Sequence, residues 1–524
     1  MQQARHKYRH GCVTADCASR SQRINIGGIH VRNHRQRSPP TMVDTSNVPA
    51  VDSADWLVVG AGPVGTLAVA TVLRSGNQTV FWVDPCFECL GRLGMRYSSV
   101  PANTRTDRVL KALRALPALS LDESQNRRKP TRPRLIDEPP LGTAALQLSI
   151  DALRDGSAAL RKQPNVRTYR GAVRGLHGDD DTVRGASSRW RAEVRFPGHE
   201  ETTVLSARAV LLASGAAPRQ PPAALVGALG ASVRWLPHDD AVAPHRLRKL
   251  CDADAGASSE AFRGRRFAVI GGSHSGTLAA KHALELCDAS RVDVYHRGAL
   301  RFADERDGWI KYDGTGLKGV AKEWALQQQR VQRNESHACA VGAEEAEVEE
   351  AEADAEMEAE AEANAKAATG VKVAEAAAAA TEDAMLRRVH VHEDAPKSGD
   401  AADDAAALAK RLHDSRAEIV VWTTGFERRA EPGPDGAAAA TEEPQPSVSW
   451  AGRPIDLATA GHEPRTTHAV AADQGAIGLY GAGIGFPAVA VDPEGLHEPW
   501  VGFGSDAIDV IERILAVERE RESH

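Results

Sequence analysis

The sequence lacks the long apolar run that a membrane-spanning helix requires. No stretch of about 18 apolar residues is free of charge. The mean hydropathy of the whole chain is negative, at −0.37. We therefore expect no transmembrane segment.

The chain also lacks a charge excess of one sign outside a single local run. It has 64 basic and 71 acidic residues, and eleven of the acids, with no base, lie in residues 341–365. Residues 1–41 hold eight Lys and Arg and one acid, and without these two segments the body is close to neutral. A neutral body does not favour nucleic acid as a partner.

Cysteine is scarce, with seven residues in 524. An odd number scattered over a long chain excludes a disulfide framework and favours a reducing compartment. The spacing of Cys86 and Cys89 suits a disulfide, but no second Cys or His pair accompanies it. We expect two packed thiols and no metal site, with a redox pair as the less favoured alternative.

The first 50 residues predict a disordered leader or a targeting segment. Residues 1–41 are rich in Arg and Ser and nearly free of acid, as transit peptides are, but they show little helical amphipathicity. The composition leaves two locations open. The chain is cytoplasmic, or it is organellar if residues 1–41 form a transit peptide, and Met42 is an alternative start.

The first strong motif is the glycine turn Gly60-Ala61-Gly62-Pro63-Val64-Gly65, between an apolar run and an Ala-rich helical segment. In such a turn the first glycine permits the bend, the second lets the backbone reach a pyrophosphate, and the third lets the helix pack closely. Asp84 stands 19 residues after Gly65, at the end of the next predicted strand. We expect a dinucleotide site formed by Gly60, Gly62, Pro63, Gly65 and Asp84.

A second glycine turn, Gly271-Gly272-Ser273-His274-Ser275-Gly276, also follows a predicted strand. Ser273 replaces the middle glycine and offers a hydroxyl to a phosphate. The next strand ends in His296-Arg297 where an acid would be usual, and a guanidinium binds a 2′-phosphate that a carboxylate would repel. Gly271, Ser273, Gly276 and Arg297 therefore predict an NADPH site. The alternative is that Arg297 is only a solvated charge.

Two such motifs predict an α/β protein with two Rossmann-like dinucleotide-binding domains, the second inserted in the first. We expect a first domain from residues 51–222 and 424–524, and an NAD(P) domain from residues 223–423. The second domain contains an exposed acidic Ala/Glu insertion at about residues 342–380. Two sites imply one tightly held redox cofactor and one diffusible hydride donor, so that NADPH reduces FAD.

Four segments together resemble the two-dinucleotide-binding-domain flavoproteins. They are the two glycine turns and the strand-into-glycine segments 212–218 and 422–426. The resemblance implies that Gly215, Gly481 and Gly483 lie against FAD. Residues 97–103, Tyr-Ser-Ser-Val-Pro-Ala-Asn, resemble a segment of flavin-containing monooxygenases whose Asn lies beside the flavin and assists oxygen activation. This role falls on Asn103, with an N-cap of the following helix as the alternative.

The chain is also similar to the lysine and ornithine N-hydroxylating monooxygenases. Their uncharacterised relatives carry a segment that matches residues 309–319 here. Trp309, Tyr312 and Asp313 of this segment line a substrate cleft or belong to the core. The segment with which ornithine hydroxylases meet their substrate is not recognisable after Arg297, so ornithine and lysine are not implied as substrates.

The resemblance implies an FAD-dependent, NADPH-using monooxygenase. Oxygen would add to the reduced flavin, and the hydroperoxide would oxygenate a nucleophilic nitrogen or sulfur of a small-molecule substrate, as in an amino-acid N-hydroxylase. One alternative is a flavin reductase or oxidase without oxygen insertion, using Cys86 and Cys89. Another is a non-catalytic flavoprotein whose acidic insertion recruits a protein partner. His238, His245 and His274 receive no role, because this chemistry needs no protein nucleophile.

Overall fold

The computed structural model describes residues 53–104, 106–114, 143–179, 189–253, 262–307, 309–332, 389–392, 401–428, 446–457, 468–500 and 505–523. The predicted leader and the acidic insertion at about residues 342–380 lie outside these ranges. Within them, no helix combines the length and the apolar character that crossing a membrane would need.

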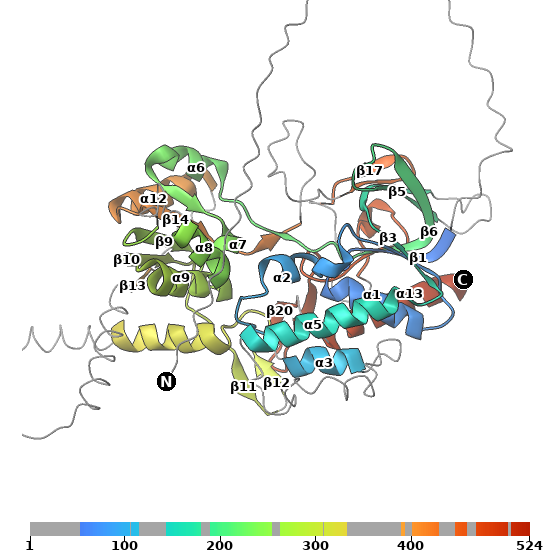
Figure 1. The fold of residues 1–524 in the computed structure, drawn as a ribbon, viewed down its shortest axis with the longest axis horizontal. Coiled ribbons are helices and arrows are strands. Elements are labelled where there is room, and N and C mark those ends of the chain that lie inside the picture. The colour runs from blue at the N-terminus through green and yellow to red at the C-terminus, as the bar shows by residue number, and fades with distance from the viewer. Residues whose placement is uncertain are drawn as a thin grey trace, which may run out of the picture. The chain divides into compact units, whose positions relative to one another are not determined.

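The larger of two main sheets has nine strands in the order β17-β16-β4-β5-β6-β1-β2-β3, with β18 beside β6 (Figure 1). The strands are β1 (Ser53–Val59), β2 (Val80–Val83), β3 (Val166–Tyr169), β4 (Ala172–Asp179), β5 (Arg189–Arg195), β6 (Thr202–Leu212), β16 (Ser447–Trp450), β17 (Arg453–Ile455) and β18 (Leu479–Gly481). Strands β6, β1, β2 and β3 run parallel, whereas β4 and β5 form an antiparallel extension.

Helices cover one face of the parallel part of this sheet (Figure 1). They are α1 (Pro63–Arg74), α3 (Thr106–Arg114), α5 (Thr143–Leu160) and α13 (Ser505–Ser523). Helix α1 contacts both α5 and α13. The apolar core beneath these helices joins residues 56–166 to residues 480–515, so the end of the chain completes the core that its beginning starts.

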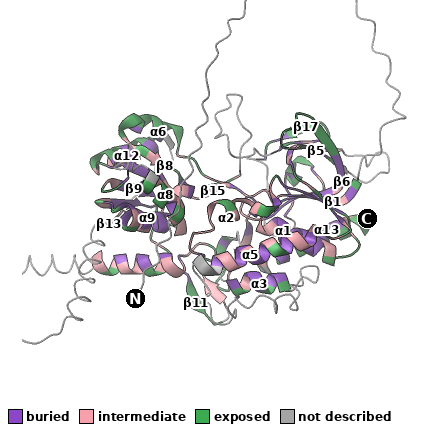
Figure 2. Cartoon of the chain, in the orientation of Figure 1, coloured by how far each residue is buried: buried purple, intermediate pink, exposed green. Residues whose placement is uncertain are grey.

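The smaller main sheet has five parallel strands in the order β13-β10-β9-β14-β8. The strands are β8 (Arg234–Leu236), β9 (Arg266–Ile270), β10 (Arg291–Tyr295), β13 (Val389–His392) and β14 (Ile419–Trp422). Parallel sheets are buried on both faces, and Figure 2 shows these strands buried between helices with exposed outer faces. One face packs on α7 (His238–Val242), α8 (Pro244–Ala253) and α9 (His274–Cys287), and the other on α6 (Ala223–Leu229) and α12 (Ala401–Asp414).

Short elements connect and flank the two sheets. Strand β7 (Ala217–Pro218) pairs antiparallel with β15 (Phe426–Glu427), so the segments before and after the five-stranded sheet run side by side. The other elements are η2 (Phe87–Cys89), α2 (Gly91–Arg96), η5 (Gly230–Ser232), β11 (Asp304–Arg306), β12 (Trp309–Lys311), η8 (Ala472–Gln474), β19 (Ala488–Val491) and β20 (His497–Trp500).

The predicted fold class is confirmed. The protein is α/β, and in each main sheet a parallel strand, β1 or β9, runs through a glycine turn into a helix. The domain boundaries at residues 222 and 424 stay predictions.

The shared core predicts that the C-terminal helix is needed for the stability of the first sheet. Ile514 of α13 is 1% exposed, and we expect Ile514→Ala to reduce the free energy of unfolding by about 2–5 kcal/mol, the usual cost of such a cavity. Urea unfolding measures the change. The exposed Arg519 of the same helix supplies the control, because Arg519→Ala should change stability by less than about 0.5 kcal/mol. Equal, small effects would show that α13 does not support the core.

Candidate functional site

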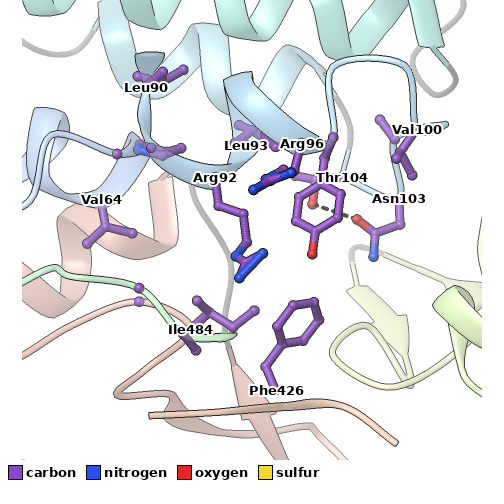
Figure 3. Close-up of a pocket in the computed structure, with 18 of the residues that line it drawn as sticks. Val64, Leu90, Arg92, Leu93, Arg96, Val100, Asn103, Thr104, Phe426 and Ile484 are labelled. Atoms are coloured by element: carbon purple, nitrogen blue, oxygen red, sulfur yellow. Dashed lines mark hydrogen bonds between the residues drawn. The ribbon is translucent and has the colours of Figure 1, made fainter. Parts of the chain in front are cut away.

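A large cavity, of about 1250 Å³, is lined by residues of both glycine turns. Gly60, Gly62 and Pro63 come from the first turn, and Ser273, His274 and Ser275 come from the second. The rest of the wall includes the segments that follow β2 and β12 and the turn after β18. Figure 3 shows part of this wall, with Arg92 and Ile484 extending toward the same space.

The first glycine turn has the geometry that a bound pyrophosphate requires. Gly60 has a φ of +108°, which a residue with a side chain rarely adopts. A Cβ on Gly65 would lie 2.0 Å from the carbonyl oxygen of Gly60, so only glycine lets α1 pack against the turn. A Cβ on Gly62 would meet no protein atom within 4 Å. The open space beside Gly62, at the N-terminus of α1, therefore fits a phosphate group.

Asp84 binds the protein backbone on both sides of its carboxylate. Oδ2 accepts a hydrogen bond from the N–H of Ala61 at 2.6 Å, and Oδ1 accepts one from the N–H of Cys86 at 2.6 Å. Burial raises the pKa of Asp84, and these two bonds only partly offset it. Asp84 therefore ties the end of β2 to the glycine turn. It also lines the cavity, and its contact with a ribose stays a prediction.

The second turn repeats this geometry. Gly271 has a φ of +125°, and a Cβ on Gly276 would lie 1.8 Å from the carbonyl oxygen of Gly271. Ser273 precedes α9 in an extended conformation, and its hydroxyl makes no capping bond to the helix. Because Ser273 also lines the cavity, its hydroxyl and the first N–H groups of α9 are available to a phosphate.

Arg297 lies outside this cavity. It follows β10, its side chain is exposed, and it forms no hydrogen bond or ion pair with the described part of the chain. Its predicted contact with a 2′-phosphate would therefore be made at the protein surface, beyond the end of β10. That role stays a prediction, as does the alternative of a solvated charge.

The three glycines predicted to lie against FAD have different surroundings. Gly215, with a φ of +76°, and Gly483, with a φ of +88°, both line the cavity. Gly481 lies in β18 instead, where a Cβ would meet the ring of Phe486 at 2.3 Å. Gly481 thus has a packing reason to be glycine, independent of any cofactor.

Asn103 lines the cavity, and its side chain is exposed to it (Figure 3). Its Oδ1 accepts a long hydrogen bond of 3.4 Å from the hydroxyl of Thr104. Helix α3 begins at Thr106, so Asn103 is not the residue directly before the helix. The N-cap alternative loses its basis, and a contact of Asn103 with a ligand stays a prediction.

The segment of residues 309–319 supplies part of the cavity wall through Asp313. Its carboxylate accepts a hydrogen bond of 2.8 Å from Arg108 of α3 and is paired with Lys318. Burial alone would raise the pKa of Asp313, but the bonds from Lys318 and Arg108 lower it. Trp309 and Tyr312 do not line the cavity.

His238 is a cavity residue that the sequence analysis left without a role. It begins α7, directly after β8, and only 6% of its surface is exposed. Burial lowers its pKa to about 4, so the imidazole is neutral at physiological pH. The sequence analysis predicted no strand before His238, so nothing in the sequence distinguished it from a packed histidine.

Cys86 and Cys89 are joined in a disulfide, so the expectation of two packed thiols was wrong. The intervening residues form the single turn η2, which brings the two sulfur atoms together. Both cysteines line the cavity directly after Asp84. Two other cysteines, Cys251 and Cys287, are buried and free, with their sulfur atoms 3.3 Å apart.

Comparison with known proteins shows similarity to monooxygenases. No protein-family model matches the chain. Monooxygenase AgnR1 from Paecilomyces divaricatus is 28% identical over 284 residues, which cover 52% of this chain and 66% of that protein. The chain thus spans just under two thirds of the length of this curated relative. The predicted resemblance to monooxygenases is confirmed by this match.

Two solved structures are among those that match the chain at low identity. L-lysine 6-monooxygenase from Pseudomonas syringae is 16% identical, with a TM-score of 0.44, over 89% of this chain and 99% of that one. Oxidized steroid monooxygenase bound to NADP is 18% identical, with a TM-score of 0.30, over 48% of this chain and 40% of that one.

The geometry of the first turn predicts opposite consequences for two of its glycines. Gly62→Val should fold normally, because nothing surrounds the new side chain, but should purify without flavin, because that side chain fills the space of the phosphate. Gly65→Ala should lose about 1–3 kcal/mol of stability, because its Cβ collides with the backbone. Flavin absorbance and urea unfolding separate the two effects. A fully flavinated Gly62→Val protein would contradict the assignment of this turn.

Proposed function

We propose that the protein is an FAD-dependent monooxygenase that uses NADPH and O2 to oxygenate a small molecule. One observation carries the proposal: Gly62 and Ser273, from two separate glycine turns, line the same cavity. A dinucleotide held at one turn can therefore meet a dinucleotide held at the other. The similarity to a protein named as a monooxygenase supports oxygen transfer as the outcome.

The residues of the chain divide the binding work between the two turns. The N–H groups at the start of α1, beside Gly62, would hold the pyrophosphate of FAD, and those at the start of α9, beside Ser273, would hold that of NADPH. Bound FAD supplies hydride acceptance and oxygen activation. Asn103 offers an amide donor and acceptor to the ligands that meet in the cavity, without changing its own charge.

The substrate belongs to the class of molecules with a nucleophilic nitrogen or sulfur, and an amino acid is one candidate. The resemblance of residues 309–319 to N-hydroxylating monooxygenases supports this class, and Asp313 of that segment lines the cavity. The carboxylate of Asp313 is already bound by Arg108 and Lys318. Substrate recognition therefore depends on the arrangement of these three charges and not on one free carboxylate.

The location and the protein partner are proposals from composition. We infer a cytoplasmic protein, or an organellar one if residues 1–41 are a transit peptide, because that segment is basic and nearly free of acid. The acidic insertion at about residues 342–380 is the part of the chain suited to a protein partner, because its charge and lack of large apolar residues favour an exposed segment.

The proposed activity is tested by separating the reaction into two halves. Purified protein should be yellow, and anaerobic NADPH should bleach its flavin spectrum faster than NADH does. Admission of oxygen should then restore the spectrum through a transient species. An oxidase or reductase would reoxidise without one. Protein without flavin, or flavin that NADPH does not reduce, would contradict the proposal.

Asn103 predicts a change in how the activated oxygen is used. Asn103→Asp replaces the amide donor with a negative charge in the cavity wall, and we expect it to fold, bind FAD and accept hydride from NADPH. Hydrogen peroxide should then replace most of the oxygenated product. The ratio of peroxide to NADPH consumed measures this coupling. Asn77→Asp, at an exposed position outside the cavity wall, is the matched control. Unchanged coupling in Asn103→Asp would remove Asn103 from the chemistry.

A further inference from the structure

His238 is a buried polar side chain whose ring nitrogens have no hydrogen-bond partner. Only 6% of the residue is exposed, and neither Nδ1 nor Nε2 is paired within the described part of the chain. His238 also lines the cavity. Buried polar groups in native proteins nearly always have a partner, and a ligand bound in the cavity that His238 lines would supply one.

The neighbours of His238 leave it free to meet that partner. The adjacent carboxylate of Asp239 accepts hydrogen bonds from Tyr97 and Arg92 instead. The Arg96 guanidinium lies near the same carboxylate, with Nε 4.0 Å from Oδ2. Of these groups, the charges of Asp239 and Arg92 act on the imidazole, and they oppose one another.

Two aromatic rings lie beside the imidazole and also contact each other, with their centroids 6.4 Å apart. The ring centroid of Phe426 is 5.1 Å from that of His238, and the ring centroid of Tyr97 is 6.5 Å away. Phe426 extends into the cavity below the segment of residues 92–104 (Figure 3). Burial and the charge of Arg92 lower the pKa of His238 to about 4, against the opposing effect of Asp239. A neutral imidazole beside these aromatic rings offers one donor and one acceptor to a flat polar ligand.

The strand order shows which end of a dinucleotide His238 faces. Leu236 of β8 is paired with Val421 of β14, and Val421 is paired with Val269 of β9, all in parallel register. Gly271 follows Val269 by two residues, and His238 follows Leu236 by two. The glycine turn and His238 therefore lie at the same carboxyl edge of the sheet, two strands or about 10 Å apart.

In a fold of this type the pyrophosphate lies on the glycine turn, and the adenosine ribose lies at the end of the second strand of the unit, here β10. Strand β10 is on one side of β9, and β14 and β8 are on the other. The nicotinamide half of the dinucleotide must then extend toward β14 and β8, where His238 and Phe426 are.

We propose that His238 binds the carboxamide of the nicotinamide ring. The neutral imidazole forms a hydrogen bond to the carboxamide, and the cluster of Tyr97, Phe426 and His238 offers the nicotinamide ring an aromatic surface. The inference rests on the proposed use of NADPH. It assigns His238 as the residue that positions the hydride donor. His238 is far from the glycine turn along the chain, and no sequence motif links the two.

The test compares two nucleotides that differ only in the nicotinamide. Isothermal titration of the FAD-loaded protein measures the affinity for NADP+ and for 2′-phospho-ADP-ribose, which lacks the nicotinamide. We expect His238→Phe to weaken NADP+ by about 5- to 30-fold, the factor that one or two kcal/mol represents. Its affinity for 2′-phospho-ADP-ribose should not change. His238→Gln, which keeps a donor and an acceptor, should recover part of the loss.

Two controls separate this effect from damage to the fold. His245→Gln alters a histidine that does not line the cavity and should leave both affinities unchanged. The melting temperature of nucleotide-free His238→Phe should equal or exceed that of the wild type, because the variant removes two unpartnered polar atoms from a buried site. A large fall in melting temperature would overturn the inference, since it would mean that the ring nitrogens already have a partner.

The remaining outcomes distinguish this inference from the proposed function. If His238→Phe binds NADP+ as the wild type does, or weakens both nucleotides equally, His238 does not contact the nicotinamide. If the wild type binds neither nucleotide, the proposed use of NADPH fails as well.

Discussion

The close approach of a helix to a glycine turn is the contact on which the cavity depends. In each half of the protein a glycine, Gly65 or Gly276, packs against the carbonyl oxygen of the glycine that begins its turn. This contact is possible because glycine has no Cβ. Any side chain there would push the helix away from the strand before it. The contact brings the N-termini of α1 and α9 to the wall of one cavity, where their free N–H groups favour phosphate.

The segment after β2 forms a second constraint on this wall. Asp84 accepts hydrogen bonds from the first glycine turn and from Cys86, and the Cys86–Cys89 disulfide closes the turn that follows. Arg92 and Tyr97, a few residues later, reach Asp239 of α7. One stretch of chain thus connects the first glycine turn to the five-stranded sheet, and it passes along the cavity throughout.

Two carboxylates in or next to the cavity wall are paired within the chain, whereas the buried His238 is not. Asp313 is held by Arg108 and Lys318, and Asp239 by Arg92 and Tyr97. His238, by contrast, is neutral, and its two buried ring nitrogens have no partner within the described part of the chain. Because these carboxylates are already paired, we propose that the site recognises its ligands chiefly by hydrogen-bond geometry.

The sequence by itself determined the parts of this protein that local spacing controls. Both glycine turns, the parallel strands before them and the helices after them follow from residues adjacent in the chain, and so did the resemblance to flavin monooxygenases. The spacing of Cys86 and Cys89 permitted a disulfide without requiring one, because bonding depends on how the intervening turn folds. Helix α3 begins at Thr106, so Asn103 does not directly precede it. A capping pattern in the sequence does not fix this start, because it also depends on packing.

Only the tertiary structure decided which side chains share the cavity. Arg92, His238 and Phe426 come from distant segments, and strand order brings them together at one sheet edge and its neighbouring loop. No sequence pattern encodes that order, because each strand carries the same apolar signature whichever neighbour it pairs with. Gly481 and Arg297 both fit a cofactor pattern in the sequence, and the structure adds that the first packs on Phe486 and the second is exposed, while their contacts with a cofactor stay predictions. The spacing of residues along the chain limits which contacts are possible. The packing of segments that are distant in the sequence decides which of these contacts form.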